Sequence, residues 1–194
     1  MGCETFTQIQ RGAPGIPRSL LTQRLALLER SGLIRRVPNV GVRGARYVPT
    51  EAGHALGPVC FALGEWSARW LEIRPEHLDP YMAVWSLSHN LIIDQLPPER
   101  VVVRFEFRNQ PKKSSRFWLL LDHGVGEVCV SSPGDDDLIV TADIERLVQW
   151  NLGHLSWAQA RAGGGIVVEG SRRLARALPT WAAPDMFAHV KPAV

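Results

Sequence analysis

The spacing of hydrophobic residues changes along this chain of 194 residues, and the change limits the folds it can adopt. Early in the chain, Leu21, Leu25 and Leu28 recur at intervals of four and three, as on one face of an amphipathic helix. In 101–107, which reads VVVRFEF, large apolar residues occupy alternate positions, as in a half-buried strand. We therefore predict an α+β protein, with a helix-rich first domain followed by a domain of antiparallel strands and helices.

A proline-containing junction, IRPEHLDP at 73–80, separates the two patterns. Pro75 disfavours continuation of the helix before it, and Asp79 followed by Pro80 is a favourable start for the next helix. We therefore place one domain at 1–74 and the other at 79–194.

The charged residues are distributed unevenly between these domains. Residues 11–46 contain eight arginines and a single acidic residue, Glu29. Residues 75–194 contain 12 lysines and arginines against 14 acidic residues. A genome-wide preference for arginine would explain the choice of arginine over lysine, but it would not explain the missing acids. The first domain is therefore predicted to bind a polyanion.

The first domain has the order of elements of a winged helix. We predict a helix at 4–11, a turn at 12–15, a helix at 17–31, and strands at 33–38 and 45–49 joined by a loop at 39–44. Thr50 is expected to cap a long helix with a kink at Gly57–Pro58 and an apolar stripe. The stripe consists of Leu56, Val59, Leu63, Trp66 and Trp70.

In a helix–turn–helix protein the second helix enters the major groove of double-stranded DNA, and its first residues contact base edges. Arginine suits guanine, glutamine suits adenine, and serine or threonine suits either base or a phosphate. The predicted contacts are Arg18, Ser19, Thr22 and Gln23 on the helix, Arg35 and Arg36 on the first strand, and Arg43 and Arg46 at the loop, or wing. The alternative is an amphipathic helix whose polar face is only solvated.

Three segments, RGAPGIPRSLLTQRLALLERSGLIRR, GARYVPTEAGHAL and LGEWSARWLE, closely resemble the HxlR-type winged-helix transcriptional regulators of bacteria. The resemblance covers about residues 4–72, and the turn, the recognition helix, the wing and the TEAG helix start are all in register. It implies that Ser19, Thr22, Gln23 and Arg24 belong to the DNA-reading helix, and Arg43 and Arg46 to the wing.

The chain departs from the family's pattern at two points. Pro17 precedes the recognition helix where members usually have serine or threonine. The helix therefore loses a side-chain N-cap worth about 1 kcal/mol, and the fixed φ of the proline ring offsets part of this loss. Members also begin with a cysteine-containing helix that helps to form the dimer and with a tryptophan-containing segment, whereas this chain starts after their equivalent. We expect either that the true start lies upstream or that the DNA-binding domain is shortened and weakened.

The second domain is predicted to contain strands at meander spacing. The strands are expected at 101–107, 116–122, 126–130, 137–141 and 165–169. Helices are expected from Asp79–Pro80 to Pro97, from Thr141, from Ser156, and at 171–178. The stretch from LDPYMAVWSL to VVEGSRRLARALPTW resembles, more loosely, the sterol-carrier-like domain over about residues 79–182, which implies a hydrophobic pocket.

Large aromatic residues, which also include Phe117 and Trp181, either line a cavity between this sheet and its helices or form an ordinary core. The candidates for the cavity are Trp85, Phe105, Phe107, Trp118, Trp150 and Trp157. Asp135, Asp136 and Asp137 could suggest a metal ion, but SPGDDD is more simply a polar turn.

The sequence contains none of the catalytic signatures GxSxG and HExxH, and no phosphate-binding or dinucleotide-binding loop. The chain contains three cysteines, an odd number, and they are far apart: Cys3, Cys60 and Cys129. We therefore expect no disulfide framework, and we expect a cytoplasmic location. No apolar run approaches the ~20 residues that cross a bilayer. We therefore expect a protein that is not an enzyme and has no metal, no cofactor and no membrane segment.

Two functions are consistent with these features. The first is a transcriptional regulator that binds operator DNA as a homodimer, with a C-terminal domain that senses a small apolar ligand or supports assembly. The second is a protein that binds lipids or other apolar small molecules and whose winged helix no longer binds DNA.

Overall fold

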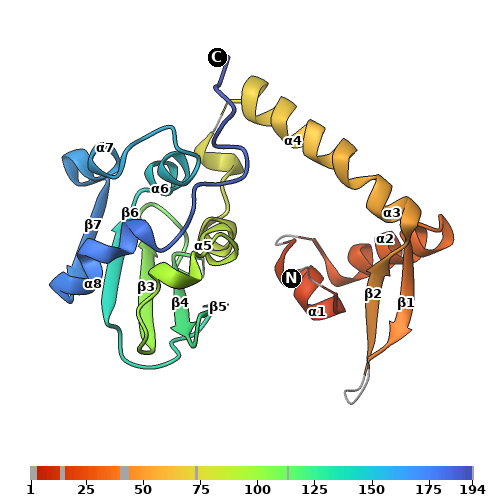
Figure 1. Cartoon of the computed structure of the whole chain (residues 1–194), viewed down its shortest axis with the longest axis horizontal. Helices are drawn as coiled ribbons and strands as arrows, with labels where there is room; N and C mark the ends of the chain where they lie inside the picture. The colour runs from red at the N-terminus through yellow and green to blue at the C-terminus, as the bar shows by residue number, and fades with distance from the viewer. Residues whose placement is uncertain (1–3, 14–15, 40–43, 73, 113, 194) are drawn as a thin grey trace. The chain divides into compact units, whose positions relative to one another are not determined.

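The computed structural model describes residues 4–13, 16–39, 44–72, 74–112 and 114–193. The chain forms two compact units, Met1–Ala68 and Arg69–Val194 (Figure 1). The first unit contains α1 (Phe6–Arg11), α2 (Arg18–Arg30), β1 (Ile34–Pro38), β2 (Ala45–Pro49), α3 (Glu51–Ala55) and most of α4 (Gly57–Trp70). This order confirms the predicted sequence of two helices, two strands and a helix.

Local signals explain where α1 and α2 begin and end. Thr5 and Gln8 form a capping box at the start of α1, in which each side chain accepts a hydrogen bond from the other residue's backbone N–H. Pro17 gives α2 no side-chain cap, and Gly32, with a φ of 69°, follows its last turn. Leu21 and Leu25 are the buried residues of α2, so these two anchor the helix on the unit.

The TEAG segment holds the start of α3 against the end of α2. The Thr50 hydroxyl donates to the Gly32 carbonyl at 2.6 Å and accepts from the Gly53 N–H at 3.2 Å. A Cβ atom at Gly53 would collide with the Leu33 carbonyl oxygen, so only glycine fits this close approach. The expected kink lies at the junction of α3, which ends at Ala55, and α4, which begins at Gly57; Leu56 between them keeps helical dihedrals, with φ −74° and ψ −20°.

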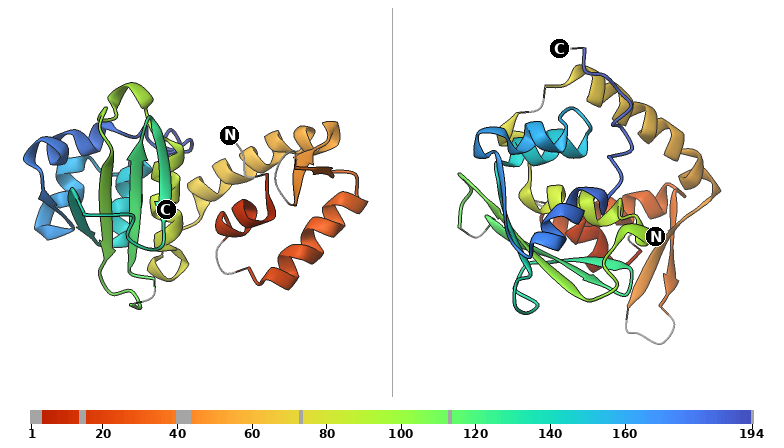
Figure 2. Two further views of the ribbon diagram at one scale, coloured as in Figure 1. Left: turned by 90° about the horizontal axis from the view of Figure 1, so that it is seen from below. Right: turned by 60° about the vertical axis from the view of Figure 1, so that its left-hand side comes forward.

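The second unit places helices on one side of a five-stranded sheet (Figure 2). Its strands are β3 (Val101–Phe107), β4 (Arg116–Asp122), β5 (Val125–Cys129), β6 (Leu138–Ala142) and β7 (Ile166–Gly170). Its helices are α5 (Pro80–His89), α6 (Ile144–Asn151), α7 (Trp157–Arg161) and α8 (Arg172–Ala177), with 3-10 turns η1 (Pro75–His77), η2 (Ile93–Gln95), η3 (Ala162–Gly164) and η4 (Leu178–Thr180). The helices cover the sheet face that carries Val101, Val103 and Phe105.

The sheet is mixed, which differs from the predicted meander. Its order is β5-β4-β3-β6-β7, and β3 pairs in parallel with β6 while the other pairs are antiparallel. The chain after β5 therefore crosses to the far side of β3. Asp137 guides this crossing, because its N–H donates to the Val102 carbonyl at 2.9 Å and its carboxylate accepts from the Val102 N–H at 2.8 Å.

Two predicted helix boundaries are also wrong. Helix α5 ends at His89 instead of extending to Pro97, because the chain then forms a bridge between Leu91 and Ala182. Helix α6 takes Asp143 as its N-cap instead of Thr141, because Thr141 still belongs to β6. The predicted cap at Ser156 is confirmed, since its side chain accepts from the Gln159 N–H at 3.3 Å.

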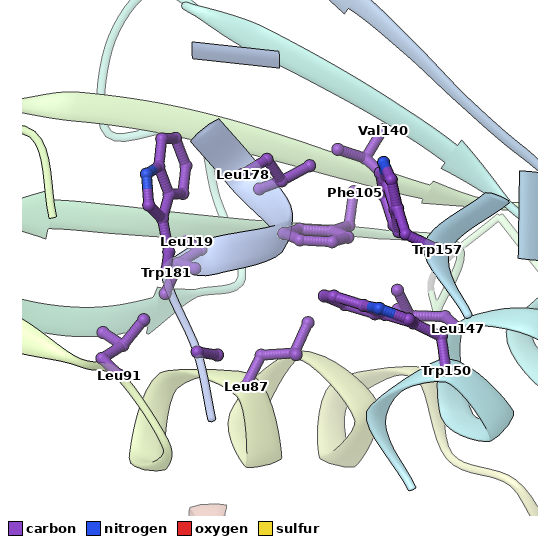
Figure 3. A pocket seen from close by; sticks show the side chains of 11 residues that line it. Leu87, Leu91, Phe105, Leu119, Val140, Leu147, Trp150, Trp157, Leu178 and Trp181 are labelled. Atoms are coloured by element: carbon purple, nitrogen blue, oxygen red, sulfur yellow. The ribbon is translucent and has the colours of Figure 1, made fainter. Parts of the chain in front are cut away.

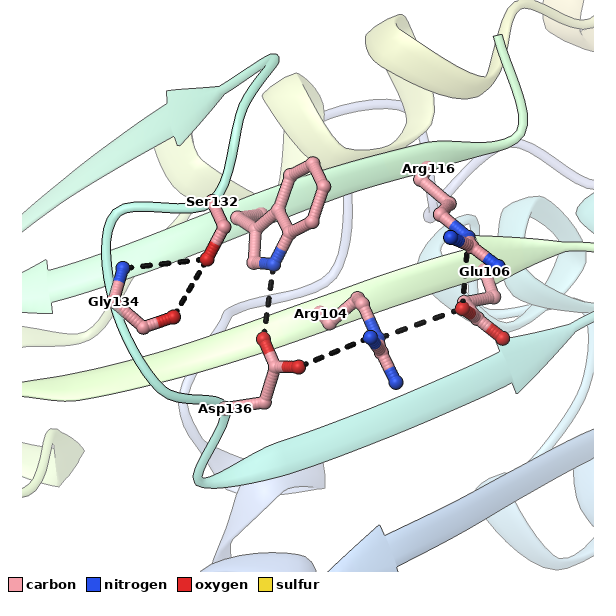
Figure 4. Close-up of polar contacts among 7 residues, drawn as sticks. Arg104, Glu106, Arg116, Ser132, Gly134 and Asp136 are labelled. Carbon is pink, nitrogen blue, oxygen red and sulfur yellow. Dashed lines mark hydrogen bonds and ion pairs between the residues drawn. The ribbon is translucent and has the colours of Figure 1, made fainter. Parts of the chain in front are cut away.

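A polar network covers the sheet face opposite the helices (Figure 4). The Trp118 indole Nε1–H donates to Asp136 Oδ1 at 2.9 Å, and Asp136 Oδ2 lies 3.1 Å from Arg104 Nη1. Glu106 Oε1 pairs with Arg116 Nε at 3.0 Å and lies 3.5 Å from Arg104 Nε, a contact without hydrogen-bond geometry. The aspartate run thus has structural partners at Asp136 and Asp137.

Replacing Asp136 by alanine should lower the free energy of unfolding of the second unit by about 1–3 kcal/mol. The change would leave the Trp118 N–H without its acceptor and would remove one of the two carboxylates beside the Arg104 guanidinium. Asp135→Ala is the matched control, because Asp135 is exposed and makes no side-chain contact of this kind with the described residues. Urea unfolding followed by fluorescence measures the difference, and equal stability of the two variants would contradict this role.

Candidate functional site

The exposed face of α2 carries polar side chains that are free for contact. Ser19, Gln23 and Arg24 are exposed and make no side-chain hydrogen bond or ion pair with the described residues. The opposite face is fixed by the buried Leu21 and Leu25. The helix therefore presents these three predicted DNA contacts to solvent on a firmly packed support.

The other two predicted contacts on α2 have partners inside the unit. The Arg18 guanidinium lies over the Phe6 ring, 4.8 Å from its centroid, so α1 orients this side chain. The Thr22 hydroxyl donates to the Arg18 carbonyl at 2.9 Å, and its oxygen can still accept a hydrogen bond. Sequence reasoning missed that Leu20 and Leu27 are also exposed, at 37% and 45%. Both fall on the side of α2 that carries Gln23.

The two arginines of β1 point to opposite faces of the β1–β2 ribbon. Arg35 and Arg36 are both exposed, and adjacent residues of a strand alternate between faces. Neither forms an ion pair with a described residue. The two guanidinium groups therefore cannot meet the same stretch of DNA backbone from one face of the ribbon.

The wing is only partly described. Arg43 lies outside the described residues. Arg46, on β2, forms an ion pair with Glu4 at 2.9 Å, and its side chain is 43% exposed. The Tyr47 N–H donates to the Glu4 carbonyl at 2.7 Å, which holds Glu4 beside this strand. Arg46 thus has a partner within the unit, whereas Arg24, Arg35 and Arg36 have none among the described residues.

Leu56 and helix α4 together expose a row of large apolar side chains. Leu56, Val59, Leu63 and Trp66 follow the three-and-four spacing that is typical of a helix-pairing seam, and each is more than 40% exposed. No residue of α4 is buried. Trp70 continues the same spacing.

A small apolar cavity lies between the sheet and the helices of the second unit (Figure 3). All eleven of its lining residues are apolar, and they come from α5, β3, β4, β6, α6, α7 and η4 or the segments next to them. Trp150 and Trp157 pack together on its wall, with ring centroids 4.8 Å apart. The free volume is about 20 Å³, which is room for a single water molecule.

The structure brings together three of the six aromatic residues predicted for the cavity: Phe105, Trp150 and Trp157. Trp118 lies on the opposite sheet face, paired with Asp136, because it alternates with the buried Phe117 and Leu119. Phe107 is buried but is not a lining residue, and Trp85 lines a different cavity.

Sequence reasoning missed Leu178 as a lining residue of the apolar cavity, and it counted Trp181 among the large aromatic residues without naming it as one of the six cavity candidates. Leu178 stands four residues after the buried Leu174, at the end of the helix predicted at 171–178. Trp181 instead follows the 3-10 turn, where no periodic pattern marks a buried side chain. Trp181 is 2% exposed, and its indole N–H has no hydrogen-bond partner among the described residues.

The described residues contain no cluster of three or more metal-ligating side chains. Over the same ranges, no helix is long and apolar enough to cross a membrane. Cys60 is a free thiol on the exposed surface. The hydrogen bond from Arg173 lowers the pKa of Glu99 below its ordinary value, and this pair lies on the exposed surface.

The first unit of this chain matches a known protein family. Residues 1–75 match the family model described as HxlR-like helix-turn-helix. The chain is 31% identical over 80 residues to the uncharacterized HTH-type transcriptional regulator YvaP of Bacillus subtilis strain 168, and the match covers 40% of this chain and 71% of that protein. It is 43% identical over 63 residues to an uncharacterized HTH-type transcriptional regulator of Methanothermobacter thermautotrophicus, with 31% of this chain and 47% of that protein covered.

Among solved structures, the chain is similar to the solution structure of sterol carrier protein domain 2 of Helicoverpa armigera. The TM-score is 0.43 at 22% sequence identity, and the match covers 56% of this chain and 89% of that chain.

The family match includes the whole helix–turn–helix and the strands and helix that follow it. Residues 1–75 contain α1, α2, both strands of the ribbon, α3 and α4. The match to the Bacillus protein extends over most of that regulator's length. The chain belongs to the HxlR-like helix-turn-helix family.

Proposed function

We propose that this protein is a DNA-binding transcriptional regulator that acts as a homodimer and whose second unit binds a small apolar molecule. The observation that carries the DNA-binding part is the face of α2, where Ser19, Gln23 and Arg24 are exposed and free above the buried Leu21 and Leu25. Membership of the HxlR-like family and the names of the relatives support the same function.

In this proposal the start of α2 enters the major groove. Gln23 and Arg24 supply hydrogen-bond donors and acceptors to base edges, and Ser19 contacts a base or a phosphate. One of the two β1 arginines lies toward the phosphate backbone and supplies charge without sequence preference. Arg18 and Arg46 contribute less, since Phe6 and Glu4 already hold their guanidinium groups.

Binding of the whole chain to labelled random duplex DNA at low and moderate salt tests this function. We expect binding that weakens steeply with salt, because each neutralised phosphate releases a counterion. No binding at low salt by a folded chain would contradict the proposal.

One of the two variants Arg35→Ala and Arg36→Ala should weaken binding to all duplexes by a similar factor and should reduce the salt slope by about one, because the two arginines lie on opposite faces of the ribbon. Gln23→Ala should instead change the preferred sequence recovered by selection from a random library, because its contact is to a base edge. Arg161→Ala is the matched control for charge, since Arg161 is an exposed arginine of the second unit. A similar loss for Arg35→Ala, Arg36→Ala and Arg161→Ala would point to net charge instead of a docked surface.

The homodimer in this proposal is formed through α4. The exposed seam of Leu56, Val59, Leu63 and Trp66 would pair with the same seam of a second copy, which buries apolar surface on both. Two recognition helices can then occupy two half-sites of one operator.

The apolar molecule would enter the cavity lined by Phe105, Trp150 and Trp157. Because the present free volume holds about one water molecule, binding requires these side chains to move. Dodecanoic acid or cholesterol should therefore change the tryptophan fluorescence of the chain. Trp157→Phe should reduce the change, and Trp118→Phe should preserve it, because Trp118 lies on the other sheet face. If Trp157→Phe does not reduce the fluorescence change, the ligand does not bind in this cavity.

The second candidate function is binding of apolar small molecules without DNA binding, and the wholly apolar lining of this cavity favours it. The DNA-binding experiment separates the two candidate functions. A chain that responds to dodecanoic acid and does not bind duplex DNA at low salt belongs to the second class.

A further inference from the structure

A second cavity of the C-terminal unit differs in character from the apolar one. It lies between the η1–α5 region and α6, and its volume is about 370 Å³. That volume is within the usual range for a small-molecule site. Its walls include the apolar side chains of Met82, Trp85 and Val148, and its polar lining includes Asn151 and Asp185. Leu147 lines this cavity as well as the apolar one, so a single side chain is common to both.

A chain of hydrogen bonds runs along the deep side of this cavity. The Asn151 amide Nδ2 donates to Ser86 Oγ at 3.0 Å, and the Ser86 hydroxyl donates to Asp185 Oδ2 at 3.2 Å. Asn151 is 9% exposed, and its Oδ1 is buried without a hydrogen-bond partner among the described residues. A buried acceptor without a donor is unfavourable, so this site lacks one hydrogen-bond donor.

The charged groups of the cavity favour a cation. Asp79 and Asp185 both line it, and neither forms an ion pair within the described ranges. Among the described residues that line the cavity there is no lysine or arginine, and His77 is the one basic side chain. Asp79 accepts from the Met82 N–H and Asp185 from the Phe187 N–H, and both carboxylates keep further lone pairs.

We propose that this cavity binds a small apolar molecule that carries one primary ammonium group. The carboxylates of Asp79 and Asp185, which both line the cavity, attract its positive charge. Its three N–H donors match the carboxylate of Asp185 and, after a rotation of the amide that brings it out of its buried position, Oδ1 of Asn151. The apolar part packs against Met82, Trp85 and Val148. This site is separate from the apolar cavity and from the DNA-binding surface, and it does not depend on the function proposed for either.

Calorimetric titration of the full chain with three ligands of similar skeleton tests the proposal. The ligands are 2-phenylethylamine, 2-phenylethanol and 3-phenylpropionate, at pH 8, where an unperturbed histidine is neutral and a primary amine is charged. We expect the amine to bind about tenfold more tightly than the alcohol, and the carboxylate to bind most weakly. Equal binding of all three, or no binding of the amine, would overturn the proposal.

Two variants locate the binding. Asp79→Asn keeps the helix cap, because asparagine caps as well as aspartate, and Asp185→Asn keeps the side-chain shape. Each should lower amine affinity about tenfold and should leave the alcohol within about twofold. Asp94→Asn is the control, because it removes an exposed carboxylate that does not line the cavity, and it should change neither affinity. An equal loss in the control would overturn the proposal, and Asp79→Asn alone decides if Asp185→Asn does not fold.

Discussion

A chain in which Leu63 is replaced by glutamate should be a monomer and should bind duplex DNA about 100-fold more weakly than the unaltered chain. Leu63 is 64% exposed in the single chain and lies at the centre of the apolar seam of α4. In a dimer formed through this seam, the two introduced carboxylates would be buried next to each other. The free energy of burying these charges is far higher than that of leaving each carboxylate on the open surface of a monomer.

The loss of DNA affinity follows from the loss of the pair. Two linked recognition helices bind the second half-site at a high effective concentration, whereas a monomer gains only one half-site. Light scattering measures the mass of the particle, and a salt-matched titration measures the affinity for DNA.

Ala62→Glu is the matched control for the Leu63 variant. Ala62 is exposed and lies beside the seam, at a position where a charged side chain is tolerated in helix pairs. This variant should remain a dimer with ordinary DNA affinity. If the Leu63→Glu variant stays dimeric, the dimer interface lies elsewhere. If the unaltered chain is itself a monomer, the homodimer of the proposal is wrong.

The strands and caps of this protein could be predicted where one local signal dominates. The alternation in 101–107 and 116–122 gave the bounds of β3 and β4, because one face of each strand is packed on helices. Thr50, Asp79 and Ser156 were identified as caps because an oxygen-bearing side chain stands directly before each helix.

The order of the strands could not be predicted in this way. The segment 137–141 alternates equally well whether it pairs in parallel or antiparallel, so its position beside β3 depends on contacts distant in sequence. The hydrogen bonds between Asp137 and Val102 supply that information only in the folded chain.

The membership of the cavity was predictable in part. The alternation of β4 already separates Trp118 from Phe117 and Leu119, and it could have removed Trp118 from the candidates. Trp181 carried no such signal, since it follows a 3-10 turn and its burial arises from the whole sheet–helix core.

Trp181 is also the residue whose truncation should cost most in the second unit. Its side chain is 2% exposed and contacts the main core cluster, so Trp181→Ala should lower the free energy of unfolding by about 3–5 kcal/mol. Trp181→Phe should cost about 1–2 kcal/mol, because it keeps an aromatic ring and removes an N–H that has no partner among the described residues. Urea unfolding followed by the remaining tryptophans measures both losses.

The alanine variant also tests whether the apolar cavity accepts a ligand. Removing the indole adds its volume to a cavity of about 20 Å³, and an apolar space of that kind can take up a free aromatic molecule. Added indole should therefore raise the midpoint of thermal unfolding of Trp181→Ala and should leave that of Trp181→Phe nearly unchanged, because mass action stabilises only a state with a vacant site. Equal stabilisation of both variants would place the indole elsewhere, and a small loss in Trp181→Ala would show that this tryptophan does not hold the core together.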